Sequence, residues 1–428
     1  ALSVSLSGRV GTGNIAGVAA AIGFGGPGAV FWMWIVAFLG AATAYVESAL
    51  GQIYKEEDEG QYRGGPAYYI EKAMGQKWYA WIFALTTIIA VGLLLPTVQS
   101  NAIGNAVELA VGANGVLQTS IGDVSYTKLA TATIVVSVLG IIIFGGVKRI
   151  AHFTQIVVPF MALGYILMAL VISGMHITAL PGIIMTIVTD AFTPMAGVGA
   201  AIGWGVKRGV YSNEAGQGTG PHAAAASEVQ HPAQQGLVQA FSVYVDTLFV
   251  CSATAFMILI TNQYYVTGIE SSISGGLLGT DIQANSPAFT QLALESVMGG
   301  FGKTFVAVAL FFFAFTTLLA YYYIAETNVA YIRRTFRFPG ELTVLKVILL
   351  GSVFYGTVRT ADLAWGLGDI GVGVMAWLNI IGILILFLMG KPALKALKDY
   401  EEQRKAGVTE YTFDPDKLGI KNADFWKK

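Results

Sequence analysis

Residues 11–14 read Gly-Thr-Gly-Asn and interrupt an apolar stretch that runs from Leu2 to Val10 and resumes from Ile15 to Phe24. A lipid-exposed break in a membrane helix would leave backbone N–H and C=O groups without hydrogen bonds, at a cost of several kcal/mol each. Such a break is tolerated only where a cavity or a ligand satisfies those groups. Because glycine permits unwound backbone and close approach, the stretch predicts a broken membrane helix with a binding site at residues 11–14.

The composition of the whole chain supports a membrane protein. Of its 428 residues, 55% are hydrophobic and only 12% are charged, whereas ordinary soluble domains carry about 25% charged residues. The mean hydropathy is +0.63. A formal net charge of −1 gives no indication of nucleic-acid binding. We therefore expect the lipid bilayer to surround most of the chain.

Ten apolar stretches are long enough to cross a bilayer, which takes about 20 helical residues. Five lie in the first part of the chain, at residues 2–24, 29–54, 78–111, 129–144 and 150–173. Five more lie at residues 181–211 (with a predicted break at 191–199), 236–261, 301–330, 342–358 and 361–389. This pattern predicts an all-α polytopic protein with five-helix units at 1–173 and 181–389. A charged, solvated cytoplasmic tail is predicted at 390–428.

Basic residues are distributed unevenly over the predicted loops. One set of loops carries Lys55, Arg63, Lys72, Lys77, Lys148, Arg149, Lys207, Arg208, Arg333, Arg334 and Arg337. The alternate loops carry only Lys128, Lys303 and Arg359. Cytoplasmic loops are the ones enriched in Lys and Arg. Both ends of this chain are therefore predicted to be cytoplasmic, in a multi-pass protein of the cell membrane.

Two segments of the chain resemble each other. Residues 15–25 read IAGVAAAIGFG and residues 195–205 read MAGVGAAIGWG, with eight of eleven positions identical. Small residues at helix contacts would give such a match by themselves. The other interpretation is a duplicated five-span unit. Because five crossings is an odd number, its second copy would be inverted, and paired broken helices would hold a ligand near the bilayer midplane.

The chemistry of the first break suits a zwitterion. The half-helix that begins there points N–H groups at the cavity, which attracts a carboxylate. The half-helix that ends there offers carbonyls, which suit an ammonium group or Na⁺. Thr12 adds a hydroxyl to its N–H. Asn14 has two interpretations, as the cap of the helix that starts at Ile15 or as a ligand or cation contact.

Three stretches carry a family resemblance: GTGNIAGVAAAIGFGGPGAVFWMW, YRGGPAYYI and DAFTPMAGVGAAIGWGVKRGVYSNEAGQGTGPHAAAA. They resemble the alanine or glycine:cation symporter family of the amino acid-polyamine-organocation superfamily, over nearly the whole chain. The resemblance implies a leucine-transporter-like inverted repeat of 5+5 helices with spans one and six unwound. It also implies transport of alanine or glycine with Na⁺, or in some members H⁺. Family members usually have one further helix before this core.

The resemblance also implies site residues. The substrate carboxylate would meet the N–H groups of Thr12 and Gly13. Na⁺ would bind the carbonyls of Ser7, Val10 and Phe313 and the hydroxyls of Thr316 and Thr317. In support, the segment FFFAFTTLLA places two adjacent hydroxyls in an apolar helix, although a membrane Thr also commonly bonds the carbonyl four residues earlier. Thr317 is predicted to contact the substrate as well.

Further polar residues in the apolar spans are candidates. In span three, Gln99 is predicted to contact the substrate carboxylate, with Asn101 as the competitor and helix–helix hydrogen bonding as the alternative role. Near the predicted second break, the candidates are Asp190, Phe192, Thr193, Met195 and Gly197. Asp190 has a second interpretation, as a cap of the unwound segment.

Four other ionisable residues have predicted roles. A carboxylate in a membrane span is a functional candidate by default, so Asp246 is predicted to bind a cation or carry a proton. Glu47 is predicted to form a structural pair. Glu326 is predicted to meet an arginine of a neighbouring loop. His222 is predicted to be a loop residue.

These features predict a secondary symporter that imports a small neutral amino acid with Na⁺ by alternating access, and H⁺ coupling is the alternative. An intramembrane enzyme is disfavoured because the sequence has no metal-ligand cluster, and GQGTGPH lacks the Lys-Ser/Thr of a P-loop. A channel is disfavoured because paired broken helices suit alternating access. The oligomeric state stays open.

Overall fold

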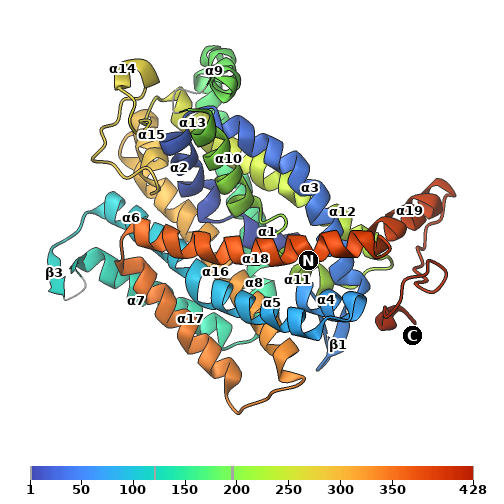
Figure 1. Cartoon of the computed structure of the whole chain (residues 1–428). Coiled ribbons are helices and arrows are strands. Elements are labelled where there is room, and N and C mark those ends of the chain that lie inside the picture. Colours follow the sequence, from blue (N-terminus) through green and yellow to red (C-terminus); the bar gives the residue numbers. More distant parts are fainter. Residues whose placement is uncertain (1, 120–121, 194–196, 428) are drawn as a thin grey trace.

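The computed structural model describes residues 2–119, 122–193 and 197–427, and these residues are mostly helical (Figure 1). Eight helical stretches among them are long and apolar enough to cross a membrane. They are α3 (Ala29–Ile53), α5–η2–α6 (Lys77–Ile89, Ala90–Leu94, Leu95–Val111), α7 (Tyr126–Ile143), α8 (Val147–Met175), α12–η4–α13 (Pro232–Tyr244, Val245–Cys251, Ser252–Ile260), α16 (Gly302–Arg333), α17 (Glu341–Val358) and α18 (Ala361–Leu388). These stretches confirm a polytopic helical membrane protein.

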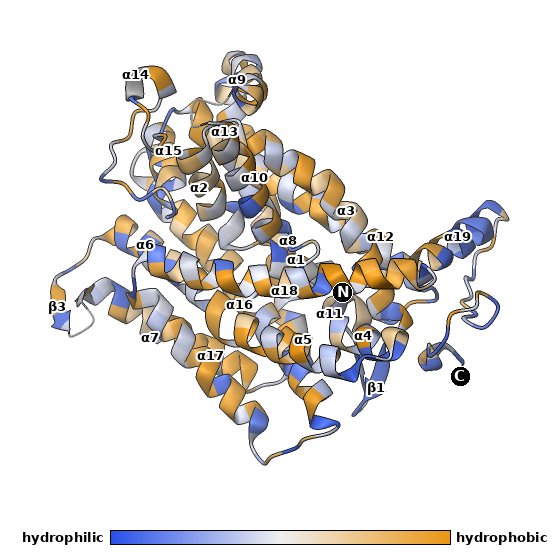
Figure 2. Ribbon diagram, viewed as in Figure 1, coloured by the Kyte–Doolittle hydropathy of each residue, from blue (hydrophilic) through white to orange (hydrophobic). Residues whose placement is uncertain are grey.

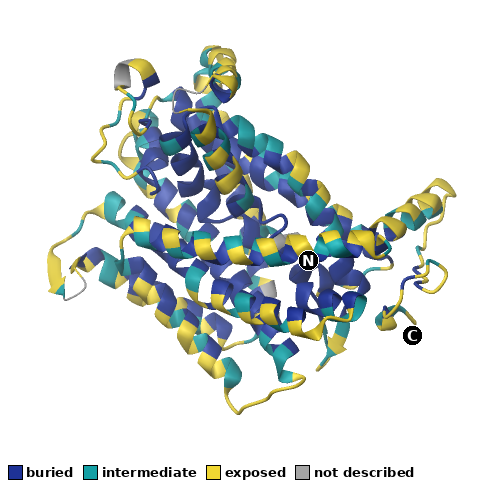
Figure 3. Ribbon diagram, viewed as in Figure 1, coloured by how far each residue is buried: buried dark blue, intermediate teal, exposed yellow. Residues whose placement is uncertain are grey.

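Apolar side chains cover the outside of the bundle as well as its interior. The outer faces of α7 and α17 are both hydrophobic (Figure 2) and exposed (Figure 3). On α8, Phe160 and Leu163 are 79% and 68% exposed. Such an outer surface is expected for helices that face lipid rather than water. The polar side chains Ser48, Thr87 and Gln99 are buried inside instead.

The first predicted break is confirmed. Helix α1 (Leu2–Arg9) ends before Gly11, a single turn η1 (Thr12–Asn14) follows, and α2 (Ala16–Gly25) then continues the span. All three residues of η1 are buried. Because neither half-helix is long enough to cross the bilayer alone, the two halves meet inside the membrane.

The second broken region differs from its prediction. The chain forms α9 (Leu180–Phe192), α10 (Val198–Asn213) and α11 (Gly220–Ala225), so it is interrupted twice. The first interruption lies within the predicted 191–199, and part of it, including Met195, lies outside the described residues. The second interruption, 214–219, lies where the sequence predicts a loop after span six, and its role as a break followed by α11 was not predicted. Figure 1 shows α9 viewed end-on beyond the top of α3, while α10 runs down beside α2.

Contacts show which interruption faces the first break. A Cβ on Gly13 would lie 2.9 Å from Ser212 Cα, at the end of α10. At the other end of α2, a Cβ on Gly25 would lie 3.1 Å from the carbonyl oxygen of Ala200. Helices α2 and α10 are therefore antiparallel and closely packed. The first break faces the interruption at 214–219, not the one at 193–197.

This packing explains the similarity between residues 15–25 and 195–205. The first segment follows its break, whereas the second precedes the interruption at 214–219, so the 180-residue offset does not align the two breaks. Both segments instead contribute to the contact between α2 and α10. The small residues are there because closely packed membrane helices need them.

Shorter helices and two β-hairpins lie at the two ends of the bundle. At one end lie the hairpin β1–β2 (Glu56–Asp58, Gln61–Arg63), in which Glu56 pairs with Arg63, and the predicted amphipathic helix α4 (Pro66–Met74). At the other end lie α14 (Ser271–Ser274), the predicted short helix α15 (Ala288–Met298), and the hairpin β3–β4 (Val116–Thr119, Gly122–Ser125). Three single turns, η3 (Ile177–Ala179), η5 (Gly299–Phe301) and η6 (Asp424–Lys427), complete the described structure.

The C-terminal tail is docked, which corrects the prediction of a solvated tail. Helix α19 (Pro392–Lys405) is followed by a segment that buries Phe413 and Ile420. Trp426 Nε1 donates to the carbonyl of Gln52 at 3.0 Å. The ammonium of Lys55 lies 4.4 Å from the centre of the Phe425 ring. Composition missed this docking because the few aromatic anchors lie in a tail that is otherwise rich in charged residues.

The tail is also held by a histidine. His231 Nε2 lies 3.1 Å from an Asp399 oxygen of α19, and its Nδ1 accepts the N–H of Ala233 at 3.1 Å. Burial lowers the pKa of His231 below its ordinary 6.5, although Asp399 acts in the opposite direction. A detached ring therefore binds a proton at a higher pH than the docked ring does.

We predict that tail docking weakens as the pH falls through 6.5, because the detached state binds the extra proton. Hydrogen exchange of residues 411–427, corrected for its intrinsic pH dependence, should be faster at about pH 5.5 than at about pH 7.5. His231→Asn keeps an acceptor for Ala233 and should abolish the difference. Equal protection of the tail in the wild-type protein at both pH values would contradict this prediction.

Candidate substrate and cation site

Protein groups satisfy the backbone of the first break. Gly11 N–H donates to Asn14 Oδ1 at 2.8 Å, and Thr12 N–H donates to Gln99 Oε1 at 3.0 Å. Asn14 N–H donates to the carbonyl of Gly11 at 3.2 Å. Asn14 therefore closes the break on its N-terminal side, and it is not the cap of α2. Gln99 lies at the break, as its predicted role requires.

The Asn14 amide connects the break to span seven. Its Nδ2 donates to Asp246 Oδ1 at 2.6 Å. Asp246 also accepts the hydroxyls of Ser212 at 3.1 Å and Thr247 at 2.8 Å. The Asn14 carbonyl accepts from Thr254 at 2.6 Å. Span one, α10 and span seven are thus joined through one buried carboxylate, which sits on the widened π-type turn η4. Such turns often mark functional sites.

The five oxygens predicted to bind Na⁺ are brought together. Thr317 Oγ1 lies 2.8 Å from the Ser7 carbonyl, 3.0 Å from the Phe313 carbonyl and 3.5 Å from the Val10 carbonyl. Thr316 Oγ1 lies 3.1 Å from the Phe313 carbonyl. The hydroxyls also make the ordinary contacts within helix α16, since Thr316 lies 2.9 Å from the Phe312 carbonyl. We call these five oxygens the cation cage. Uncharged oxygens of this kind suit a hard cation.

Close packing around the break explains its glycines. A Cβ on Gly11 would lie 2.5 Å from Thr317 Oγ1 and 3.0 Å from Gln99 Oε1. A side chain at this position would therefore separate the break from both α16 and α6. Gly13 is similarly restricted by Ser212 and by the Tyr211 ring, which a Cβ would meet at 3.2 Å.

The hydroxyl of Thr12 in the break is buried and has no hydrogen-bond partner among the described residues. An unsatisfied buried polar group costs about 1–3 kcal/mol. A polar ligand at the break would relieve this cost.

Other predicted site residues lie elsewhere. Asn101 Nδ2 donates to the carbonyls of Gly356 at 3.0 Å and Arg359 at 2.6 Å, so it performs the helix–helix role named as its alternative. Phe192 is 61% exposed and packs on Phe31, with the ring centres 5.2 Å apart.

The remaining candidates near the first interruption of span six also lie away from η1. Thr193 Oγ1 donates to the Thr189 carbonyl at 2.8 Å. Gly197 is exposed, with a φ of 88° at the start of α10. Asp190 Oδ2 accepts the Gly28 N–H at 2.7 Å, just before α3. Asp190 therefore caps the start of α3, and the unwound segment that it was predicted to cap lies partly outside the described residues.

The interruption at 214–219 is the main feature that sequence reasoning missed. Glu47 of α3 accepts the N–H groups of Gly216 and Gly218, both at 3.2 Å, and the amide of Asn379 at 2.7 Å. Both glycines have positive φ, 83° and 84°. The predicted structural role of Glu47 is thus met by backbone N–H groups. The signal was present, because EAGQGTG combines glycines with polar residues as GTGN does.

Two minor predictions have clear outcomes. Glu326 meets Arg63, with 3.4 Å between Oε1 and the guanidinium, which confirms the predicted arginine contact. His222 is not a loop residue. It is buried in α11, where its Nε2 lies 2.8 Å from the Asn328 amide.

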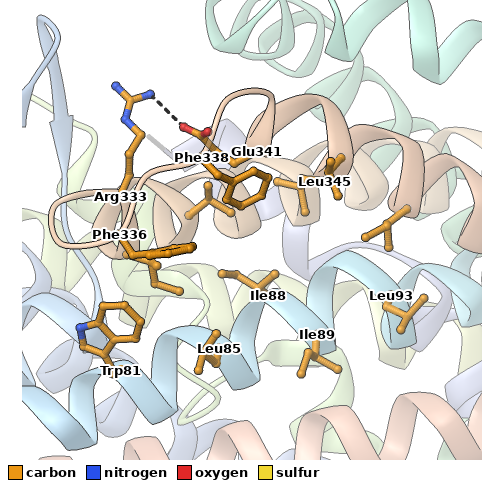
Figure 4. A pocket seen from close by; sticks show the side chains of 14 residues that line it. Trp81, Leu85, Ile88, Ile89, Leu93, Arg333, Phe336, Phe338, Glu341 and Leu345 are labelled. Atoms are coloured by element: carbon orange, nitrogen blue, oxygen red, sulfur yellow. Dashed lines mark ion pairs between the residues drawn. The ribbon is translucent and has the colours of Figure 1, made fainter.

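A separate groove lies between α5, α16 and α17 (Figure 4). Its lining is aliphatic and aromatic, with Trp81, Ile88 and Phe336 among the side chains drawn. The charged groups at its edge, Arg333 and Glu341, pair with each other at 3.8 Å. An apolar lining does not recognise a zwitterion, so the groove is not the site.

Comparison with known proteins identifies the family. The model of the sodium:alanine symporter family matches residues 1–415. The chain belongs to this family. It is therefore a multi-span membrane transporter and not an enzyme.

Three relatives show the range of the family. The chain is 58% identical to the putative sodium/proton-dependent alanine carrier protein YrbD of Bacillus subtilis (strain 168), covering 100% of this chain and 85% of the relative. It is 48% identical to the sodium/proton-dependent alanine carrier protein of Bacillus sp. (strain PS3), covering 100% and 93%. It is 40% identical to the probable sodium/glutamine symporter GlnT of Bacillus subtilis (strain 168), covering 95% and 79%.

We predict that Asp190→Ala lowers thermal stability by about 1 kcal/mol, the usual effect of removing a helix cap, and leaves substrate binding unchanged. The assay pairs a thermal melt in detergent with the concentration dependence of alanine uptake. Asp190→Asn retains an acceptor for Gly28 and should recover most of the stability. A change in the KM for alanine larger than about threefold in either variant would return Asp190 to the substrate site.

Proposed function

We propose that this protein imports alanine, or glycine, together with Na⁺ by alternating access. The observation that carries the proposal is the cation cage, in which carbonyls on either side of a broken helix meet two hydroxyls of α16. A cation bound there would hold α1 against α16 and fix the backbone of the break. Membership in the sodium:alanine symporter family supports the same ion and substrate.

In the proposed complex, the substrate carboxylate accepts the N–H groups of Thr12 and Gly13. Gln99 Oε1 now accepts the Thr12 N–H, so a carboxylate oxygen would replace one acceptor with another at the same donor. By turning its amide, Gln99 would then donate to the carboxylate. The Thr12 hydroxyl, which has no partner among the described residues, provides a further donor. The ammonium group would face carbonyls at the break.

Steric limits support a small substrate. Gly11 and Gly13 have no space for a Cβ, and the Tyr211 and Trp365 rings, with centres 4.8 Å apart, form a wall beside Gly17 and α10. The proposed substrate contacts are therefore Thr12, Gly13 and Gln99, with Asn14 and Thr317 as supports. They leave out Asn101, Asp190, Phe192, Thr193 and Gly197, which lie elsewhere.

We further propose two inverted five-span repeats, in residues 1–173 and 181–389, with 390–428 as the tail. The order of elements supports this. In the first half a broken span (α1, α2) is followed by α3, the short helix α4, and three further spans. In the second half a broken span (α10, α11) is followed by α12–α13, the short helix α15, and three further spans. Figure 1 shows α4 and α15 at opposite ends, as inversion requires.

We propose that the end with α4, α19 and both chain ends is cytoplasmic. Arg63, Lys72, Arg333 and Arg334 lie there, where they pair with acidic residues of the same end. This follows the positive-inside rule. Lys207 and Arg208 do not contribute to it, because they lie in α10 and pair with Asp369 of α18.

Uptake of labelled alanine into proteoliposomes tests the function. An inward Na⁺ gradient should drive accumulation above the external concentration, and collapse of the gradient should release it. Accumulation driven only by an H⁺ gradient would support the H⁺-coupled alternative. Flux that never exceeds equilibration under either gradient would indicate a channel and overturn the proposal.

We predict that Thr317→Ala raises the Na⁺ concentration for half-maximal uptake at least tenfold, because its hydroxyl meets three cage carbonyls. Thr317→Ser keeps the hydroxyl and should stay within about threefold of wild type. Thr316→Ala should have an intermediate effect, because its hydroxyl meets a single cage carbonyl. The measurement is the Na⁺ activation curve at saturating alanine, and unchanged curves in the double variant would show that the cation binds elsewhere.

We predict that Gln99→Leu weakens alanine binding at least tenfold, since it removes the proposed amide donor and leaves the volume similar. Calorimetry with purified protein in saturating Na⁺ measures the change. Asn101→Leu removes an amide of the same helix that bonds α17, so it controls for loss of helix packing. Undiminished affinity in Gln99→Leu would assign Gln99 to packing.

A further inference from the structure

Four ionisable side chains are buried around the two breaks: Arg9, Glu47, Glu214 and Asp246. Each is at most 3% exposed. One guanidinium faces three carboxyl groups, so the cluster carries two more acidic groups than basic ones. Unpaired charge is costly in a low-dielectric interior. Protons or metal cations must therefore balance part of this cluster.

The three carboxyl groups differ in their hydrogen bonds. Glu47 accepts two backbone N–H groups and the Asn379 amide. Asp246 accepts donors from Asn14, Ser212 and Thr247. Glu214 accepts the Thr219 hydroxyl at 2.9 Å on Oε2, and the Tyr321 hydroxyl also faces this carboxyl group. Its Oε1 is buried and has no partner among the described residues. Glu214 is therefore the carboxyl group with an oxygen available to a ligand.

Glu214 adjoins the cation cage. A Cβ on Gly8 would lie 3.0 Å from Glu214 Oε2 and 3.7 Å from the Ala320 Cβ. Gly8 directly follows the cage residue Ser7, and Ala320 lies three residues after Thr317, close to the same face of α16. The cage itself has five uncharged oxygens. A cation bound in it would find its negative counter-charge in the neighbouring carboxylate.

A small cavity reaches this carboxyl group. It lies between α1, α11 and α16, and its lining consists of Gly8, Glu214, Thr219, Gly220, Ala223, Ala320, Tyr323 and Ile324. Helix α11 leads from the second break toward the end of the bundle that carries α4 and the tail. The cavity has room for about one water molecule beside the Glu214 carboxyl group, which could exchange a proton with it.

We propose that Glu214 is the shared counter-charge for Na⁺ and H⁺, ionised when Na⁺ fills the cation cage and protonated when the cage is empty. The inference rests on the proposed function. When Na⁺ arrives, the O–H bond at Glu214 breaks and the proton passes to water in the cavity. When Na⁺ leaves, a hydronium ion returns a proton to Oε1. The total charge of the site is thereby conserved, so Na⁺ and H⁺ compete without sharing ligand atoms.

Other titratable groups face Glu214 from the neighbouring helices. They are Arg9 from α1, Glu47 from α3, Asp246 from η4, Tyr211 from α10, and Tyr321 from α16. Arg9 stays charged throughout. Glu47 and Asp246 have full sets of donors that favour their ionised forms. Glu214 alone combines a free oxygen with a cavity and the adjoining cage.

The test is Na⁺ binding by the purified full chain at a series of pH values from about 5.5 to 8.5. Competition with one proton should raise the apparent Kd for Na⁺ about tenfold per pH unit on the acid side. Adding Na⁺ to weakly buffered wild-type protein should release up to one proton per Na⁺ bound. If Na⁺ still binds but no proton is released across this range, the inference is wrong. The proposed Na⁺ symport would not be contradicted by that result.

Substitutions identify which carboxyl group exchanges the proton. Glu214→Gln should bind Na⁺ more weakly and with no pH slope, whereas Glu214→Asp should keep the slope. Glu326→Gln, which removes a buried carboxyl group of α16 far from the cage, should behave as wild type. Loss of the slope in Asp246→Asn or Glu47→Gln, with the slope intact in Glu214→Gln, would overturn the assignment. Failure of wild type to bind Na⁺ at any pH would instead count against the proposed function.

Discussion

The structure depends on hydrogen-bond partners for the backbone N–H and C=O groups that are unwound inside the bilayer. At the first break, the side chains of Asn14 and Gln99 accept the freed N–H groups of Gly11 and Thr12. Gln99 belongs to span three, whereas Asn14 belongs to span one and contacts span seven. The break is therefore fixed by span three through Gln99 and by span seven through Asn14 and Asp246. A ligand that replaces one acceptor changes a contact between spans.

The same constraint explains how a cation and a substrate can act together. The carbonyl of Ser7 lies in the last turn of α1 and that of Val10 directly after it, and the donors of Gly11 and Thr12 follow at once. A cation that binds the carbonyls positions the N–H groups for the substrate carboxylate. By linkage, a bound carboxylate strengthens cation binding by the same factor. Coupling between the two ligands then needs no long-range conformational change, because their binding sites are adjacent. Short unwound backbone supplies both binding surfaces.

Much of this architecture could be predicted from sequence, for identifiable reasons. Eight spans end within a few residues of their predicted bounds because hydropathy follows the bilayer thickness. The first break was visible because glycine and polar residues interrupt an apolar run. The cation cage was found because Thr316 and Thr317 are adjacent in an apolar helix and the family resemblance aligned them with Ser7, Val10 and Phe313.

What could not be predicted depends on contacts distant in sequence. The interruption at 193–197 looked like the partner of the first break, but only the packing of α10 on α2 shows that 214–219 faces it. Asp190 gave no sign that it would bind Gly28, 162 residues away. Glu214 and the docked tail were missed for the same reason, since their partners come from other helices.

The central claim is that the backbone at residues 11–14 binds the substrate carboxylate beside a cation held by the cage. A density map of the protein with alanine and Na⁺ tests this most directly. We predict one carboxylate oxygen within hydrogen-bonding distance of Thr12 N–H, with Gln99 Oε1 displaced, and an ion among the five cage oxygens. Alanine bound near 193–197, with the hydrogen bond from Thr12 N–H to Gln99 intact, would contradict the account.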